Sequence, residues 1–112
     1  MKIRFKDYNC LVKIEEYISG KMPAIFLYNA DSMWMDDFCI IQGLHVLFTA
    51  TSNMPDEHLN QDEVIIRNYD ENEGIYECLV KAQVISEAIR FTRYTRQPIC
   101  KLLLKQEDNG KE

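Results

Sequence analysis

Glycine and proline are scarce in this sequence, whose 112 residues include four glycines and three prolines. This composition leaves no Gly-rich phosphate loop, and no G-x-S-x-G nucleophile elbow is present. Long hydrophobic runs are missing too. The longest, over residues 38–50, is interrupted by Gln42, Gly43 and His45 and is too short to cross a bilayer. We therefore expect a soluble, cytoplasmic protein that does not associate with membranes.

Close pairs of cysteine or histidine are also missing. The four cysteines lie tens of residues apart, and the two histidines stand alone. Without a CxxC, HxxxH or HExxH spacing, the sequence predicts no metal site and no cofactor. No motif indicates a catalytic residue, so we expect a protein that is not an enzyme. In a reducing compartment the cysteines should be free thiols.

Acidic and basic residues are unevenly distributed along the chain. Residues 54–77 include eight acids and one base, whereas residues 78–105 include six bases and one acid. The two blocks can neutralise each other across the fold. Alternatively, a negative pole or a positive strip faces a partner. In the second case, the acidic residues of 56–77 could imitate DNA.

Hydrophobic periodicity indicates five strands. Residues 10–15 alternate apolar and polar side chains, and residues 24–28 are short, aromatic and bounded by turn residues. Residues 44–51 are rich in β-branched and aromatic side chains, and residues 63–67 are mostly β-branched. Residues 91–104 are expected to form the last strand.

One helix is expected between the fourth and fifth strands. Ile75, Leu79 and Ala82 fall on one helical stripe, which predicts an amphipathic helix over about 71–84. The expected fold class is α+β: an antiparallel sheet of four to five strands covered by one main helix, in the order β-β-β-β-α-β. Pro98 places the last strand at a sheet edge or in a bulge.

The chain length fits a single domain. We assign residues 1–105 to one α+β domain and the charged residues 106–112 to a flexible polar tail.

The stretch that opens the predicted helix is rich in acids. Asp70 and Glu73 have the spacing of a capping box, and Glu71 suits the first turn of a helix. Gly74 is unexpected, because glycine costs about 1 kcal/mol relative to alanine within a helix. Capping therefore explains the acids, whereas Tyr69, Asn72 and Gly74 need another reason. The alternative is a binding loop built from Tyr69, Glu71, Asn72, Glu73 and Gly74.

Two other segments carry side chains suited to binding. Met33, Trp34 and Met35 are flanked by polar and acidic residues, a composition typical of a protein-binding patch, although Trp34 could instead cover the core. Residues 90–96 interleave arginines, including Arg93 and Arg96, with aromatic side chains. This pattern suits phosphate contacts and base stacking, but the chain is acidic, with a pI near 5.0.

Four short motifs occur in a fixed order. They are NMP at residues 53–55, DEV at 62–64, YDENEG at 69–74 and PICKL at 98–102. In these motifs the chain resembles a family of small bacterial proteins of unknown function, encoded largely on plasmids, conjugative elements and prophages. The resemblance covers roughly the C-terminal half, and residues 31–47 depart from the family pattern. It implies a genetic setting on a mobile element and no mechanism.

These observations favour a non-enzymatic accessory protein that binds or regulates a protein partner. The alternatives are a nucleic-acid-binding protein that uses Arg90–Arg96 and an acidic DNA mimic that uses residues 56–77. Because an uncovered sheet edge can pair with a second copy, a homodimer is also expected.

Overall fold

Two four-stranded antiparallel sheets form most of the fold in the part of the chain that the structure describes. The computed structural model describes residues 1–16, 22–30, 46–54 and 56–104. The first sheet has the order β1-β2-β3-β4, formed by Lys2–Phe5, Tyr8–Glu16, Pro23–Asn29 and Val46–Thr49. The second has the order β5-β6-β8-β7, formed by Thr51–Ser52, Glu63–Ile66, Pro98–Lys101 and Arg90–Phe91. The fold is α+β, but the prediction of a single sheet is wrong.

A single residue, Ala50, connects the two sheets. It is fully buried between the end of β4 at Thr49 and the start of β5 at Thr51. Its N–H donates to the carbonyl of Ile25 at 2.9 Å, and its carbonyl accepts from the N–H of Arg67 at 2.8 Å. The strand predicted over residues 44–51 therefore passes from one sheet to the other, because its backbone groups bond first to β3 and then to β6.

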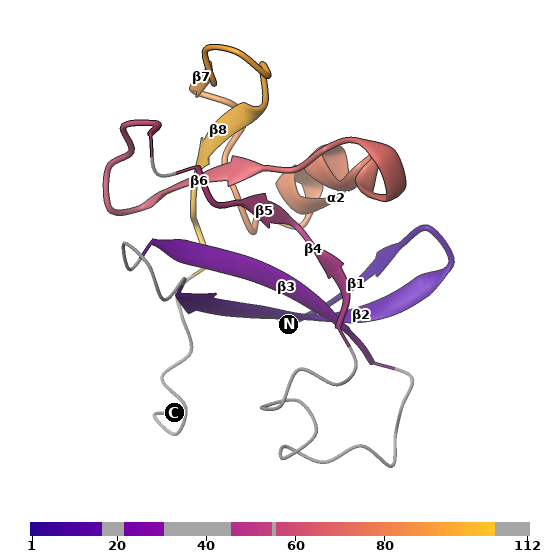
Figure 1. The fold of residues 1–112 in the computed structure, drawn as a ribbon. Coiled ribbons are helices and arrows are strands. Elements are labelled where there is room, and N and C mark those ends of the chain that lie inside the picture. The colour runs from indigo at the N-terminus through magenta and orange to yellow at the C-terminus, as the bar shows by residue number, and fades with distance from the viewer. Residues whose placement is uncertain (17–21, 31–45, 55, 105–112) are drawn as a thin grey trace.

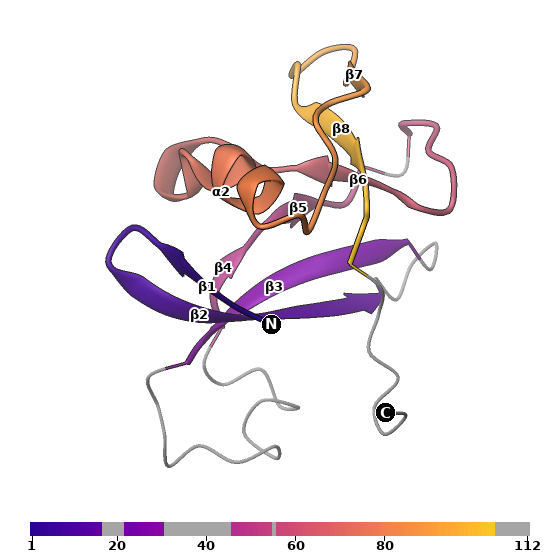
Figure 2. The same ribbon diagram turned by 180° about the vertical axis from the view of Figure 1, so that it is seen from behind.

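The two sheets and the helix share one apolar core. The predicted inward residues of β2, Cys10, Val12 and Ile14, are buried, as expected from the alternation along a strand. Phe5 and Phe48 pack edge to face with ring centroids 4.9 Å apart. Figures 1 and 2 show α2 lying above the β1–β2 hairpin and beside the second sheet. The helix contributes its buried residues to the same core.

The predicted helix over 71–84 is shorter and interrupted. A 3₁₀ helix, η1, spans Asp70–Asn72, and the α-helix α2 spans Ile75–Lys81. Gly74 lies between them with φ of +95°, in the left-handed region where glycine has no Cβ penalty. A Cβ at this position would lie 3.8 Å from the ring of Phe5, so the backbone conformation, and not a lack of space, requires the glycine.

The capping box is also absent in the form that we predicted. The N–H of Glu73 donates to the main-chain carbonyl of Asp70 at 3.1 Å and not to its side chain. Asn68 provides the cap, because its Oδ1 accepts the N–H groups of Gly74 at 3.1 Å and of Tyr76 at 3.0 Å. An asparagine seven positions before the first helical residue lies outside the usual N-cap spacing, so the sequence motif did not reveal it.

The C-terminal end of α2 forms a Schellman motif. The N–H of Gln83 donates to the carbonyl of Val80 at 3.0 Å, and the N–H of Val84 donates to that of Leu79 at 3.0 Å. Gln83 has φ of +64°, a conformation that disfavours any residue with a Cβ. Glycine is the usual residue at this position of the motif.

Replacing Gln83 with glycine should therefore raise the free energy of unfolding by about 0.5 to 1 kcal/mol. The left-handed conformation costs a residue with a Cβ about 1–2 kcal/mol, and the extra chain entropy of glycine offsets part of that gain. Urea unfolding measures the change. The control is Lys81→Gly in the last turn of α2, which should lower the same free energy by about 1 kcal/mol. A loss of stability in both variants would contradict the left-handed conformation of Gln83.

The last predicted strand, over 91–104, is instead a hairpin. β7 and β8 pair antiparallel, and the residues between them turn back. Thr92 and Gln97, both buried, close the turn through an N–H to carbonyl bond of 2.9 Å and an N–H to Oγ1 bond of 2.9 Å. Pro98 is the first residue of β8, an interior strand, so its missing N–H is tolerated without an edge or a bulge.

Some predictions lie outside the described residues, including the polar tail 106–112. Across the described ranges, the structure contains no helix of the length and apolarity needed to cross a bilayer.

Candidate functional site

A cleft of about 330 Å³ lies between the β6–α2 connection and the β7–β8 hairpin. In Figure 1 these two elements lie at the upper part of the molecule, with α2 beside the second sheet. The cleft is lined by Asn68, Tyr69, Tyr76, Phe91, Thr95, Arg96, Gln97 and Pro98. The fold thus brings together two segments that the sequence analysis singled out separately, the helix-opening stretch and the arginine-rich strip.

Two exposed aromatic rings and two arginines border this cleft. Tyr69 is 41% exposed and Phe91 is 50% exposed. The guanidinium carbon of Arg67 lies 5.1 Å from the centroid of the Tyr69 ring, and that of Arg96 lies 6.0 Å from the centroid of Phe91. These distances fit cation–π contacts, which hold the rings and the charges together at the rim.

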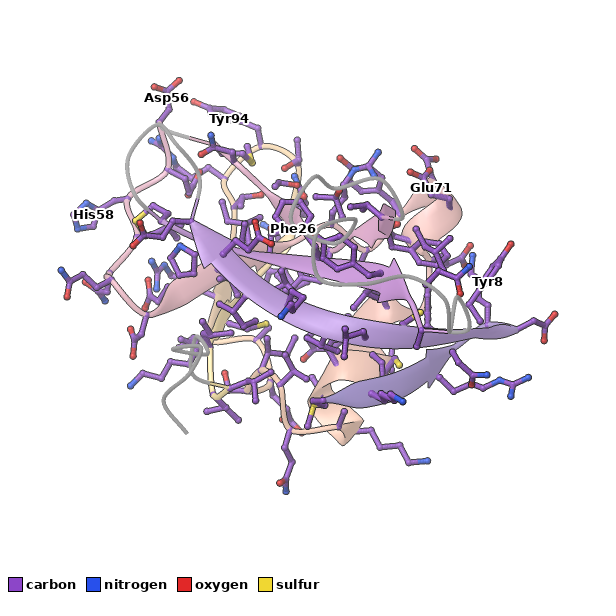
Figure 3. All side chains as sticks on the ribbon, turned by 90° about the horizontal axis from the view of Figure 1, so that it is seen from below. Tyr8, Phe26, Asp56, His58, Glu71 and Tyr94 are labelled. Carbon is purple, nitrogen blue, oxygen red and sulfur yellow. The ribbon has the colours of Figure 1, made fainter. Side chains whose placement is uncertain are left out.

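The hairpin extends this surface beyond the cleft. Tyr94, at the turn, is 84% exposed, and the guanidinium carbon of Arg93 lies 5.6 Å from its ring centroid. Figure 3 shows Tyr94 pointing away from the body of the protein, in a part of the surface separate from Glu71. The predicted residue Arg93 therefore lies next to the cleft and does not line it.

The polar groups on the hairpin side of the cleft are already used within the fold. The Oε1 atom of Gln97 accepts from the hydroxyl of Ser52 at 2.7 Å, and its Nε2 donates to the hydroxyl of Thr95 at 2.9 Å. The hydroxyls of Thr95 and Thr92 lie 2.8 Å apart. These bonds fix the hairpin against β5 and give the cleft a preformed wall.

The predicted loop residues have different roles. Asn72 is fully buried, and its Nδ2 donates to the carbonyl of Thr49 at 2.8 Å, so it supports the fold beside the sheet crossing. Gly74 serves the backbone turn described above. Glu71 and Glu73 are exposed, and Glu71 forms a 2.9 Å ion pair with Arg67. Of this set, only Tyr69 lines the cleft.

Two ion pairs among the described residues join the acidic and basic blocks. Glu63, only 4% exposed, accepts two hydrogen bonds from Arg90, at 2.8 and 3.2 Å. The bonds from Arg90, together with the N–H of Asn60, lower the pKa of Glu63 to about 2. Asp62 and Lys101 form a longer pair of 3.7 Å. These contacts agree with the prediction that the blocks neutralise each other across the fold.

Several lining residues escaped the sequence analysis. Asn68 and Tyr76 flank the predicted capping box, and neither belongs to a charge pattern or a motif. The position of Asn68 just before the acidic run was the one available signal, because asparagine often bonds to nearby backbone N–H groups. The other predicted patch, Met33, Trp34 and Met35, lies outside the described residues.

The cysteines of the described segments show no sign of activation. Cys10 and Cys100 are buried, Cys78 is half-buried, and all three are free thiols. Burial raises the pKa of Cys100 to about 12, and it also raises the pKa of Cys78. A nucleophilic cysteine needs the opposite shift.

Metal binding has no candidate in this part of the chain: the described residues include no cluster of three or more histidine, cysteine or acidic side chains placed to hold an ion. The cleft is thus defined by aromatic rings, arginines and amides.

Comparison with protein-family models, with curated proteins and with solved structures finds no match to this chain.

Proposed function

We propose that this protein is a non-enzymatic binding protein whose cleft receives a short segment of a protein partner. The observation that carries this proposal is the pairing of exposed aromatic rings with arginines around a preformed cleft. Tyrosine and arginine are enriched among residues that dominate binding energy at protein interfaces. Tyr69, Phe91 and Arg96 supply this chemistry from two elements held by the fold.

Nucleic-acid binding is the second candidate, because three arginine–aromatic pairs lie on this surface. Local charge favours the protein partner. Arg67 is paired with Glu71, and Asp70 and Glu73 are exposed on the same connection. The whole chain has a net charge of −5. A DNA mimic is less favoured, since Glu63 of the acidic block is buried in an ion pair.

Replacing Phe91 with alanine is expected to weaken the partner's affinity by about tenfold or more, the effect of losing a central interface side chain worth at least ~1.4 kcal/mol. The partner would be recovered from the host by affinity purification, identified by mass spectrometry and then titrated against purified variants. Tyr69→Ala should act in the same direction.

Leu103→Ala is the matched control, because Leu103 is 50% exposed, like Phe91, but does not line the cleft. It should leave the affinity within about twofold. The melting temperatures of all three variants should stay close to that of the parent, since half-exposed side chains contribute little to stability. Equal losses of affinity for Phe91→Ala and Leu103→Ala would contradict the proposal. A purified partner whose affinity is unchanged by both Phe91→Ala and Tyr69→Ala would contradict it as well.

The family resemblance and the mobile-element setting stay predictions within this proposal. A small binding protein of this kind would act as an accessory to a plasmid, conjugative element or prophage by docking on a host protein. The homodimer is a prediction of the same standing. Sedimentation of the purified chain at two concentrations tests it directly.

A further inference from the structure

We propose that the cleft selects a segment carrying a carboxylate next to an aromatic side chain. This inference rests on the proposed function and names the chemistry of the partner segment. The lining includes no aspartate or glutamate. The chemistry of the ligand depends on which polar atoms of the lining are not already used in hydrogen bonds within the fold.

On the α2 side of the cleft, Asn68 and Tyr76 each have a hydrogen-bond donor that the fold does not use. Asn68 uses its Oδ1 to accept two backbone N–H groups, so its Nδ2 group is the part left for a ligand. The hydroxyl oxygen of Tyr76, another lining residue, accepts from the N–H of Ala88 at 2.9 Å, which leaves its O–H as a donor. No described residue accepts a hydrogen bond from the Nδ2 of Asn68 or from the O–H of Tyr76. An acceptor-rich group is the complement of this wall.

The opposite wall supplies a positive charge. Arg96 is exposed, and none of the ion pairs in the described part of the chain includes it. Its backbone has φ of +57°, an unfavourable conformation for arginine that glycine or asparagine would adopt more easily. The chain thus places a long cationic side chain where local stability favours a small residue. A guanidinium beside Phe91, in a cleft that Tyr69 also lines, suits a carboxylate with an aromatic neighbour.

A nucleic acid strand fits this surface less well, because it carries a negative charge at every nucleotide. The connection beside the cleft exposes the carboxylates of Asp70, Glu71 and Glu73, which would repel those phosphates. A single carboxylate can meet Arg96 and the donors without following that connection. The observations therefore favour an acidic–aromatic peptide over a nucleic acid.

Two matched peptides test the inference on the full chain: Gly-Asp-Phe-Asp-Phe-Gly and its amide counterpart Gly-Asn-Phe-Asn-Phe-Gly, both capped at their ends. Each is titrated into ¹⁵N-labelled protein, and chemical shifts are followed. The acidic peptide should produce saturable shifts in the side-chain amide of Asn68 and the backbone amide of Arg96. Its dissociation constant should be at least fivefold lower than that of the amide peptide. Octathymidylate provides the phosphate arm.

Two substitutions locate the effect. Arg96→Gln should remove the preference for the acidic peptide, whereas Arg93→Gln, on the same turn, should keep it. Arg96→Gly should also remove the preference while raising the melting temperature, because glycine relieves the backbone at this position. That combination excludes loss of folding as the cause of lost binding.

Equal affinity for the two peptides would overturn the carboxylate preference and leave the proposed protein-binding role standing. Absence of saturable shifts with either peptide would overturn the inference as well, while recovery of a partner sensitive to Phe91→Ala would still support the proposed function. Tighter binding of octathymidylate at the same amides would overturn both and assign the cleft to nucleic acid.

Discussion

Replacing Arg90 with methionine is expected to lower the free energy of unfolding by about 2–3 kcal/mol at neutral pH. Methionine keeps the unbranched stem of the side chain but removes the guanidinium charge that faces Glu63, which is 4% exposed. Removing one partner of a buried ion pair costs about 3–5 kcal/mol, because the other charge is left uncompensated. The expected loss is smaller here for two reasons. The Arg90 side chain is 41% exposed, and the backbone N–H and Nδ2 of Asn60 still donate to the Glu63 carboxylate at 3.0 and 3.1 Å.

The control for this change is Lys101→Met, which removes the 3.7 Å pair with Asp62, both side chains being 54% exposed. An exposed pair of this kind contributes less than about 1 kcal/mol, so urea unfolding should show a small change. The double variant Arg90→Met with Glu63→Gln should recover part of the loss, because no buried charge is left. Equal losses for Arg90→Met and Lys101→Met would contradict a stabilising role for the buried pair.

The pH dependence follows from the lowered pKa of Glu63. In the parent, this carboxyl has a pKa of about 2 instead of 4.5. Its contribution to stability is therefore complete above pH 4.5 and is lost as the pH falls toward 2. In Arg90→Met the pKa should return toward its ordinary value, so the difference from the parent should be largest at neutral pH and should shrink in acid. A difference that is independent of pH would point to packing and not to charge.

The sequence predicted local structure better than it predicted how the strands assemble. The strand over 10–15 and its inward residues follow from alternation, and the strand over 24–28 follows from its aromatic composition between turn residues. Both signals depend only on neighbours in the chain. The division into two sheets depends on Ala50, whose backbone bonds to both Ile25 and Arg67. These partners lie 25 and 17 positions away along the chain. Periodicity does not carry information about such distant pairings.

The two other errors in the predicted elements have local causes. The strand over 91–104 contains a turn that buries Thr92 and Gln97, two polar residues that bond to each other. Neither glycine nor proline occurs between them, so the usual turn signal was missing. The helix was predicted too long at both ends. Gly74 delays its start, and Gln83 ends it in the left-handed conformation, at a position where glycine would have revealed the end.

For the candidate site, the sequence indicated the right segments for partly different reasons. Tyr69 was singled out because helix capping left it unexplained, and it lines the cleft. Asn72 and Gly74 were singled out on the same ground, and the fold accounts for both. Arg96 came from the arginine-rich strip, which forms a turn and not a strand face. Only the folded chain shows that Tyr69 and Arg96 border the same cleft.

Changing Asn72 to aspartate is expected to cost about 3 kcal/mol or more at neutral pH. Asn72 is fully buried, and its Nδ2 donates to the carbonyl of Thr49 at 2.8 Å. Its Oδ1 has no hydrogen-bond partner within the described structure. An aspartate would place one oxygen against that carbonyl and bury a charge with no donor. Burial of an uncompensated charge typically costs about 3–5 kcal/mol.

The same substitution at Asn68 is the matched control and should have a different outcome. There the side-chain oxygen accepts hydrogen bonds from two N–H groups at the start of α2. A carboxylate keeps both bonds, and its negative charge strengthens them because the N–H groups carry partial positive charge. Asn68→Asp should leave the free energy of unfolding unchanged or raise it by up to about 1 kcal/mol. Two Asn→Asp changes four positions apart would thus separate a buried structural amide from a capping amide.

Acid should restore much of the stability that Asn72→Asp removes. Without a donor, the introduced carboxyl has a pKa above its unfolded value of about 3.9. Below that value it is protonated in both states, and its O–H can donate to the carbonyl of Thr49. The deficit relative to the parent should therefore be smallest below about pH 3.9 and should grow as the pH rises through the higher pKa of the folded state. A deficit of Asn72→Asp below about 1 kcal/mol at pH 7 would contradict the expected burial of an uncompensated charge, and would show that water or a bound group supplies the donor that Oδ1 lacks.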